Sequence, residues 1–156
     1  LLQRFADSGR GILLGVASFW EGVDVPGDPL RGLIITKLPF KVPTEPLTAA
    51  RIEAIDSAGG NSFYDYMLPH AALRLKQGFG RLVRTRTDRG AIIILDPRLM
   101  SKTYGRYFLS SLPPAPLVTG LWADLREQLR EFYARHEVRP HDSVGAPPVL
   151  APGPRA

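Results

Sequence analysis

Three short runs of aliphatic residues stand out along the chain. They cover residues 11–16 (GILLGV), 32–36 (GLIIT) and 90–95 (GAIIIL), and each is almost free of polar side chains. Strands that are buried on both faces of a parallel sheet have this continuous pattern, whereas half-exposed strands alternate between apolar and polar residues. The three runs therefore predict three buried, parallel strands.

Helical spacing of apolar residues is found before, between and after these runs. Residues 1–8 predict the end of an amphipathic helix that stops at Gly9. Further helices are expected over residues 45–57, 62–67, 69–84, 104–112 and 121–133, the last with Thr119 as its cap. Strands that alternate with helices are typical of the α/β class. There is no initial Met or preceding strand, so we expect a piece of a longer protein.

The helix expected over residues 69–84 has two distinct faces. Ala72, Leu75, Phe79, Leu82 and Val83 fall on one side of a helical wheel, and Arg74, Gln77, Arg81 and Arg84 fall on the other. Gly78 and Gly80 interrupt this helix, although each costs roughly 1 kcal/mol relative to Ala. Glycines there favour a ligand that approaches the backbone, and arginine suits phosphate because of its planar fork of donors. The alternative is a solvated face with incidental arginines.

Positive charge is concentrated in and after this helix. Between Arg74 and Arg106 there are nine basic and two acidic residues, a net of +7, although the whole chain carries only +5. A polyanionic partner and a merely soluble, charged surface both fit this distribution. No apolar run approaches the ~18 residues of a membrane span, so no membrane partner is expected. The chain has no cysteine, which excludes disulfides and thiolate metal sites within it.

The loop after the first aliphatic run is a second candidate site. Its sequence is ASFWEGVDVPG, and loops at the carboxyl ends of parallel strands are where α/β proteins bind ligands. Phe19 and Trp20 can stack on bases if they are exposed or pack in the core, and the core is favoured for Phe19. Gly22 permits a close backbone approach, and Asp24 can accept a hydrogen bond from a ribose or orient an arginine.

Two acidic residues of the same loop suggest a different chemistry. Glu21 and Asp24 could act as paired carboxylates in acid–base catalysis or in metal binding. No third carboxylate or histidine lies in a helpful position near them, and the three histidines of the chain have no metal-binding spacing. We therefore predict no metal site in this chain.

Two long segments resemble motifs of one helicase family. QGFGRLVR (77–84) is similar to motif VI of superfamily 2 helicases in the form found in the DinG/XPD family, and DRGAIIILDPR (88–98) continues as that family does. SFWEGVDVPGDPLRGLIITKLPF (18–40) resembles the family's motif V and the loop after it. The motifs occur in the family's order, and the resemblance covers roughly residues 1–113. The last helix and the tail contribute nothing to it.

The resemblance implies an architecture for the chain. Residues 1–113 are expected to form the second RecA-like motor domain, a three-layer α/β domain with a mostly parallel sheet, truncated at its N-terminal side. Residues 114–137 are expected to form a C-terminal amphipathic helix. Residues 138–156 are rich in Pro, Gly and Ala and are expected to be disordered. The implied partners are the N-terminal RecA-like domain of the same protein and single-stranded DNA.

The resemblance also implies roles for individual residues. The residues that face ATP in a catalytic role would be Gln77, Arg81 and Arg84, with Arg84 as the arginine finger. The residues that touch the nucleotide through motif V would be Glu21, Gly22 and Asp24. The residues that contact nucleic acid would be Ser18, Trp20 and Arg74.

Some parts of a helicase motor are absent from this sequence. No Gly-Lys pair occurs, so there is no P-loop, and no acidic pair for Mg²⁺ is found. By resemblance, ATP and Mg²⁺ would be held mainly by the N-terminal domain, which in many relatives also carries a 4Fe–4S cluster. The implied activity is ATP-driven movement along single-stranded DNA, 5′ to 3′, in DNA repair in the bacterial cytoplasm at the nucleoid. The alternatives are a non-catalytic nucleic-acid-binding module and the motor domain of a DinG-type exonuclease.

Overall fold

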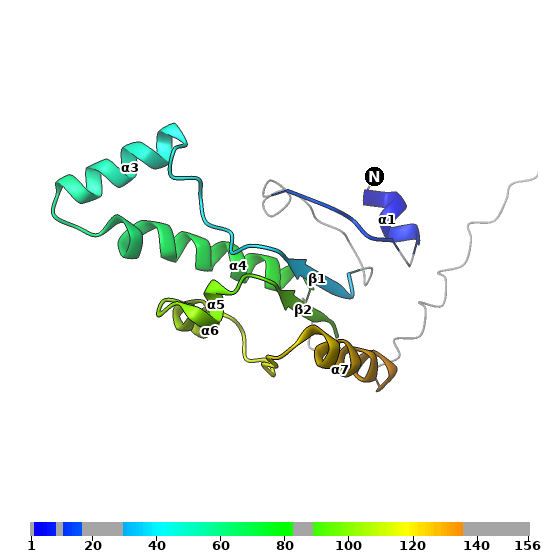
Figure 1. Ribbon diagram of the computed structural model, residues 1–156. Coiled ribbons are helices and arrows are strands. Elements are labelled where there is room, and N and C mark those ends of the chain that lie inside the picture. The colour runs from blue at the N-terminus through cyan, green and yellow to red at the C-terminus, as the bar shows by residue number, and fades with distance from the viewer. Residues whose placement is uncertain (1, 9–10, 17–29, 83–88, 136–156) are drawn as a thin grey trace, which may run out of the picture. The chain divides into compact units, whose positions relative to one another are not determined.

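The computed structural model describes residues 2–8, 11–16, 30–82 and 89–135 (Figure 1). The chain divides into two units, Leu1–Leu117 and Val118–Ala156. The described elements of the first unit are α1 (Leu2–Ser8), β1 (Gly32–Ile35), α3 (Pro46–Ser57), the π-helical turn η1 (Phe63–Met67), α4 (Leu68–Leu82), β2 (Ala91–Ile94), α5 (Arg98–Ser101) and α6 (Gly105–Ser111). In the second unit the structure describes α7 (Trp122–Arg135). Apart from α5, which the sequence patterns did not predict, the described helices lie close to the predicted positions.

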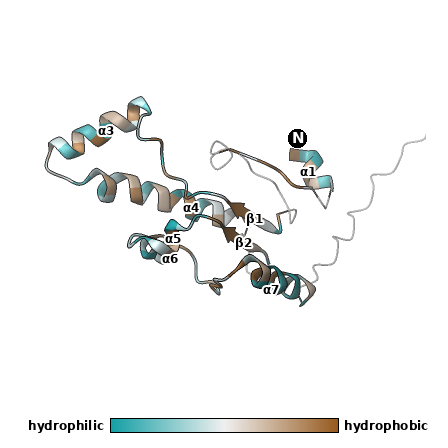
Figure 2. Cartoon of the chain, in the orientation of Figure 1, coloured by the Kyte–Doolittle hydropathy of each residue, from teal (hydrophilic) through white to brown (hydrophobic). Residues whose placement is uncertain are grey.

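The two strands β1 and β2 form a parallel sheet. Their register runs from Gly32 opposite Ala91 to Ile35 opposite Ile94. A backbone hydrogen bond of 2.9 Å from the Leu95 N–H to the Ile35 carbonyl extends the pairing beyond β2. The connection between the strands contains α3, η1 and α4, as a parallel crossover requires. Both strands are strongly hydrophobic (Figure 2), and the α/β class expected from the sequence is confirmed.

The strand expected over residues 11–16 does not form. These residues have no regular secondary structure, and Ile12 and Leu14 are 89% and 87% exposed. In the part of the chain that the structure describes, the sheet has only β1 and β2. Aliphatic composition is not enough for a strand, because the backbone groups need a neighbouring strand to pair with. The prediction of a strand at 11–16 is therefore wrong for this structure.

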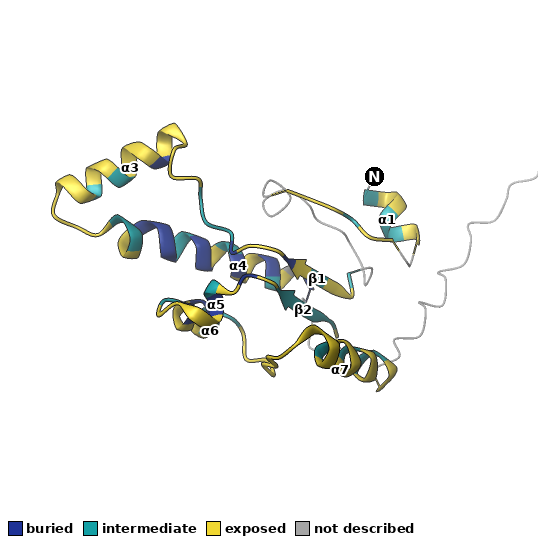
Figure 3. Ribbon diagram, viewed as in Figure 1, coloured by how far each residue is buried: buried dark blue, intermediate teal, exposed yellow. Residues whose placement is uncertain are grey.

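The core of the first unit forms around one face of α4. Leu68, Ala71, Ala72 and Leu75 are buried there, with Leu75 fully inaccessible (Figure 3). They belong to one cluster with Ile35 of β1, Leu99 of α5 and Phe108 of α6. Leu82 is also buried and Phe79 is half-buried, so the apolar face predicted for this helix is confirmed. Val83 lies outside the described residues.

The corner between α5 and α6 depends on a glycine that the sequence patterns did not single out. Gly105 is buried, and a Cβ atom on it would collide with the backbone carbonyl oxygen of Leu99. Because backbone cannot move aside as a flexible side chain can, any larger residue would force α5 and α6 apart. This close approach lets Phe108 of α6 reach the core.

The second unit is described only through α7 and the residues just before it. Leu125, Leu129, Phe132 and Tyr133 are its half-buried residues. The Leu121 carbonyl accepts hydrogen bonds from the Asp124 and Leu125 amides, and the helix begins at Trp122, three residues after Thr119. Thr119 is therefore not its cap. The tail from Val138 lies outside the described residues.

Candidate nucleotide and nucleic-acid interface

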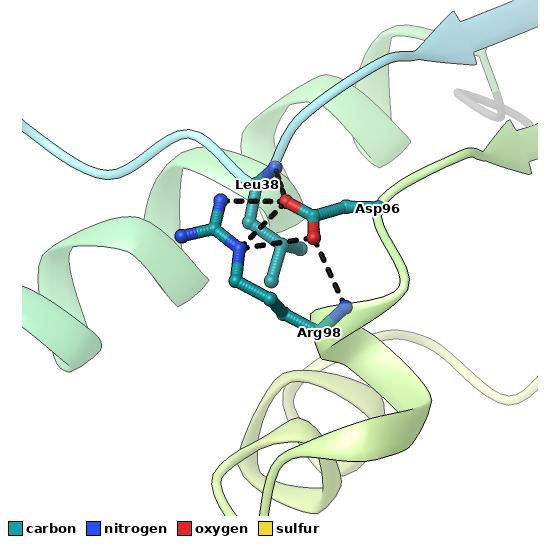
Figure 4. A network of polar contacts seen from close by, with 3 residues as sticks. All are labelled: Leu38, Asp96 and Arg98. Atoms are coloured by element: carbon teal, nitrogen blue, oxygen red, sulfur yellow. Dashed lines mark hydrogen bonds and ion pairs between the residues drawn. The ribbon is translucent and has the colours of Figure 1, made fainter.

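A buried carboxylate joins the carboxyl ends of the two strands. Asp96 follows β2, and its Oδ2 accepts a hydrogen bond from the backbone N–H of Leu38, which follows β1, at 2.8 Å. The Nε of Arg98 donates to the two carboxylate oxygens at 2.9 and 3.1 Å, and its Nη2 forms an ion pair with Oδ2 at 2.6 Å (Figure 4). We call Leu38, Asp96 and Arg98 the Asp96 clamp. It lies at the edge where α/β proteins bind ligands.

The charges of the clamp stabilise one another. Hydrogen bonds from the Arg98 guanidinium hold the pKa of Asp96 well below its usual range, although burial of the carboxylate opposes this effect. The same hydrogen bonds raise the pKa of Arg98. Asp96 and Arg98 are therefore both charged at neutral pH. A buried charge is costly once it loses its partner, so the clamp fixes the start of the loop after β1.

An aromatic cluster holds the next part of this loop. The Phe40 ring stacks on Phe63 at 5.9 Å between centroids and meets the edges of Tyr104 and Phe108 at 6.0 and 5.6 Å. The Arg98 guanidinium lies 5.4 Å from the centroid of Phe40, so the clamp and the aromatic cluster are continuous. Together they set the position of the following residue, Lys41.

Lys41, together with a second cation, contacts the buried Tyr66. Its Nζ donates a hydrogen bond of 3.0 Å to the Tyr66 hydroxyl and lies 5.2 Å from the ring centroid. The Arg51 guanidinium, from α3, lies 5.6 Å from the same centroid. The His70 ring of α4 meets Tyr66 at 4.7 Å between centroids. We call Lys41, Arg51, Tyr66 and His70 the Tyr66 cluster.

The charges that shift the pKa values of Tyr66 and His70 are positive. The hydrogen bond from Lys41 lowers the pKa of Tyr66, and the charges of Lys41 and Arg51 act in the same direction against burial. Burial lowers the pKa of His70, and the positive charges of Lys41, Arg51 and Arg74 lower it further. His70 is therefore neutral at pH 7, and the neighbouring cations disfavour a further positive charge at either ring.

The polar side of α4 is described in part. Gln77 is exposed on the side of the helix opposite Leu75, and Arg74 is half-buried. Arg81 lies in α4, but its side chain is outside the description, as is all of Arg84. A Cβ atom on Gly80 would meet open space, so no described part of the chain requires glycine there. The glycine leaves room beside the polar side of the helix.

The predicted motif V residues lie outside the described residues. They are Ser18, Trp20, Glu21, Gly22 and Asp24. Within the described ranges, no group of three or more His, Cys, Asp or Glu side chains could hold a metal ion. None of the helices in the described ranges combines the length and the apolar character that crossing a membrane requires.

Sequence patterns did not identify the Tyr66 cluster as a binding site. Lys41 is an isolated cation in a proline-rich loop, and Arg51 belongs to a different helix. One signal was available, because His70 lies four residues before Arg74 and so shares its side of the helix. Extending the polar stripe by one turn would have included it.

Comparison with known proteins identifies the family. Residues 1–115 match the family described as the helicase C-terminal domain. The chain belongs to this family. The segments that carry the resemblance in the sequence, 18–40 and 77–98, both lie within the matched range, so the DinG/XPD-type assignment is confirmed.

Several curated relatives of this helicase C-terminal domain are helicases by name. The chain is 52% identical over 116 residues to ATP-dependent DNA helicase YoaA of Escherichia coli K12, a match that covers 74% of the chain and 18% of the relative. It is 49% identical over 113 residues to 3'-5' exonuclease DinG of Bacillus subtilis, covering 72% and 12%. It is 40% identical over 141 residues to ATP-dependent helicase DinG of Mycobacterium tuberculosis H37Rv, covering 90% and 21%.

These matches also show how much of each relative the chain represents. The chain spans 12–21% of the length of these three relatives. The match to the mycobacterial DinG covers 141 residues, or 90% of the chain. A match of this length must include α7, wherever it begins. The similarity to DinG proteins therefore extends past residue 113, further than the sequence motifs indicated.

Proposed function

We propose that this domain is the second motor domain of an ATP-dependent DNA helicase that moves along single-stranded DNA, 5′ to 3′, in DNA repair. The observation that carries the proposal is family membership over residues 1–115, which include the segment Q-G-F-G-R-L-V-R. The polar side of α4, with Gln77 exposed opposite a buried apolar face, supports it. Such a helix can pack on its own sheet and still face a ligand.

The proposed division of labour follows from what the chain contains. Arg81 and Arg84 contact phosphates of ATP, with Arg84 as the finger, and Gln77 lies near the γ-phosphate or the attacking water. Glu21, Gly22 and Asp24 touch the nucleotide from motif V, and Ser18, Trp20 and Arg74 contact DNA. The N-terminal RecA-like domain of the same protein supplies the P-loop and the Mg²⁺ ligands, with or without a 4Fe–4S cluster.

The proposed organisation assigns residues 1–113 to the motor domain, 114–137 to a C-terminal amphipathic helix and 138–156 to a disordered tail. We place the complete protein in the bacterial cytoplasm, at the nucleoid, where its DNA substrate lies.

The name of the Bacillus relative, 3'-5' exonuclease DinG, supports a second candidate function, the motor domain of a nuclease. Assay of the complete protein on labelled single-stranded DNA separates the two, because only a nuclease shortens the strand.

Residues 1–156 by themselves are expected not to hydrolyse ATP. The physical reason is that the chain has no P-loop lysine to hold the β- and γ-phosphates, so an arginine finger has no bound nucleotide to act on. The measurement is phosphate release by the purified chain, with and without single-stranded DNA. Turnover that copurifies with the chain and responds to DNA would contradict the proposed two-domain site.

The fluorescence of Trp20 is expected to change when an oligonucleotide binds. The resemblance to motif V implies that this residue lies next to nucleic acid, and an aromatic ring that stacks on a base changes its environment. The chain has one other tryptophan, Trp122, which is 55% exposed. The titration is therefore done with residues 1–156 carrying Trp122→Phe. An unchanged spectrum at saturating oligonucleotide would indicate that Trp20 packs in the core instead.

The rival interpretation is a nucleic-acid-binding module without a motor role. It accounts for the basic segment after Arg74 but not for a Gln-Gly-Gly-Arg pattern on one helix. A binding module would hold DNA with the same affinity whether or not ATP is present. DNA affinity of the complete protein that depends on the bound nucleotide therefore favours the motor.

A further inference from the structure

The Tyr66 cluster brings together charges that no carboxylate in the described part of the chain pairs with. Among the residues that the structure describes, neither Lys41 nor Arg51 forms an ion pair with a carboxylate. Glu45 belongs to the same loop, but its Oε2 accepts a hydrogen bond from the Thr48 hydroxyl at 3.1 Å. Cation–π contact with one ring accounts for either cation alone. Two like charges beside the same ring repel, and a bound anion would relieve this repulsion.

The donors of the cluster also point to an anion. The Tyr66 hydroxyl accepts a hydrogen bond from Lys41 and is also hydrogen-bonded to the Thr48 side chain, so the donors left for a ligand are those of the two cations. Lys41 retains N–H groups beyond the one that contacts Tyr66, and Arg51 presents a planar set of donors. Tyr66 is only 5% exposed, so its ring is not a platform for a base. A phosphate group fits this set of donors better than a nucleobase does.

The position of the cluster relates it to the motif VI arginine. His70, Arg74, Gln77 and Arg81 follow one another at helical spacing along α4, which runs from Leu68 to Leu82. His70 and Arg81 are separated by about 16 Å at 1.5 Å of rise per residue. A phosphate at the His70 end therefore lies about three helical turns from the position of Arg81, farther than the phosphates of one nucleotide lie from one another. A nucleic-acid backbone supplies phosphates at such a distance.

We infer that Lys41 and Arg51, arranged around Tyr66, bind a backbone phosphate of the single-stranded nucleic acid on which the motor acts. The inference rests on the proposed function, which supplies the nucleic acid. It adds a contact from the loop after β1 and from α3 to a DNA path for which the sequence indicated only motif V residues and Arg74. The Asp96 clamp positions this contact through Phe40, because it fixes the loop that carries Lys41.

The test is DNA binding by the complete protein carrying Lys41→Gln together with Arg51→Gln. Glutamine keeps much of each side chain's packing on Tyr66 but removes the charge. Affinity for a fluorescein-labelled thymidine oligonucleotide is expected to fall ~10-fold, measured by anisotropy. The slope of log K against log salt should become shallower by ~0.7, the counterion release of one single-strand phosphate. Unchanged affinity and slope would overturn the inference.

Two further variants test whether the effect comes from the charges of Lys41 and Arg51, from their packing or from the net charge of the protein. The pair Lys41→Arg with Arg51→Lys keeps both charges and is expected to recover most of the affinity. If it binds as weakly as the glutamine pair, the two residues have a packing role and the inference is wrong. Arg130→Gln with Arg135→Gln removes the same charge from α7, where each arginine is already paired with a glutamate at 3.3 and 3.1 Å. A tenfold loss in this variant would attribute the effect to net charge.

A second arm distinguishes the two sources of phosphate. Binding of a fluorescent ATP analogue is measured with the same variants. A loss of ATP affinity with normal oligonucleotide affinity would assign the cluster to the nucleotide and overturn the inference. If the unmodified protein binds no single-stranded DNA at all, the proposed function fails and the inference fails with it. If the unmodified protein binds DNA normally and the glutamine pair does not change its affinity, only the inference is wrong.

Discussion

Replacing Arg84 by alanine in the complete protein is expected to lower the DNA-stimulated rate of ATP hydrolysis by ~10²-fold or more. An arginine finger stabilises the charge that develops on the transferring phosphoryl group, so its loss should reduce kcat more than nucleotide affinity. Arg84→Lys keeps the charge but loses the planar fork of donors, and it should also be a poor enzyme. Steady-state ATPase kinetics at saturating DNA provide the measurement.

The control for Arg84 is an arginine whose surroundings are described. Arg135 lies on α7, is exposed and forms an ion pair of 3.1 Å with Glu131 one turn earlier. Surface pairs of this kind contribute about 0.3–0.5 kcal/mol, so Arg135→Ala should be nearly neutral. Arg84 falls on the wheel opposite the buried Leu75 and Leu82, so its loss should not unfold the domain. Near-normal turnover of Arg84→Ala, or failure only through unfolding, would show that the finger is elsewhere.

Asp96→Asn is expected to lower the free energy of opening the loop after β1 by about 2–3 kcal/mol. The substitution leaves the Arg98 guanidinium without its countercharge and weakens the acceptor of the Leu38 amide. Removing one partner of a fully buried ion pair costs about 3–5 kcal/mol. The expected cost here is smaller because the Arg98 side chain is 40% exposed and water can partly solvate it. The local measurement is hydrogen exchange at the Leu38 amide, whose protection should fall roughly 30- to 150-fold.

The effect of Asp96→Asn should depend on pH in a defined direction. The clamp holds the pKa of Asp96 below its usual range, and the unfolded value is about 3.9. Its contribution to stability is therefore fully present above about pH 5 and is lost only as the pH falls below the unfolded pKa toward the folded one. The difference in stability between the unmodified protein and Asp96→Asn should be constant from pH 5 to 8 and should shrink in stronger acid. A difference that disappears near pH 6 would mean that Asp96 does not act as a paired carboxylate.

A surface substitution calibrates the same experiment. Glu127→Gln removes the partner of Arg130, a pair at 3.3 Å in which both side chains are more than 60% exposed. It should change stability by less than about 0.5 kcal/mol and leave the Leu38 amide unaffected. If Glu127→Gln and Asp96→Asn have equal effects on exchange, the clamp does not hold the loop.

Local patterns in the sequence predicted the regular elements and the packing face of α4. The apolar positions of that helix recur at helical spacing, and the structure buries Ala72, Leu75 and Leu82. The helix ends were close because proline fixes its own φ angle and lacks an N–H, and glycine readily adopts the conformations that end a helix. The family was also accessible from the sequence, because motifs V and VI are contiguous segments in which residue type alone carries the signal.

The same reasoning failed where an element depends on a partner. Residues 11–16 have the composition of a buried strand, but they pair with no strand within the described ranges and remain exposed. The sequence patterns did not single out Gly105, and only the approach of α6 to Leu99 shows why no side chain fits there. Strand pairing and backbone proximity are properties of the assembled chain, and a residue-by-residue pattern does not contain them.

The sequence by itself determined the class of the protein, its family and the sides of α4, because these depend on neighbours within a few positions. Only the tertiary structure decided which distant residues meet. Asp96 binds the Leu38 amide 58 residues away, and Lys41 meets Tyr66 25 residues away. Neither residue type nor spacing encodes such contacts, since they form only when a parallel crossover brings two strand ends to the same edge of the sheet. For this reason the cations around Tyr66 became a candidate site only in the folded domain.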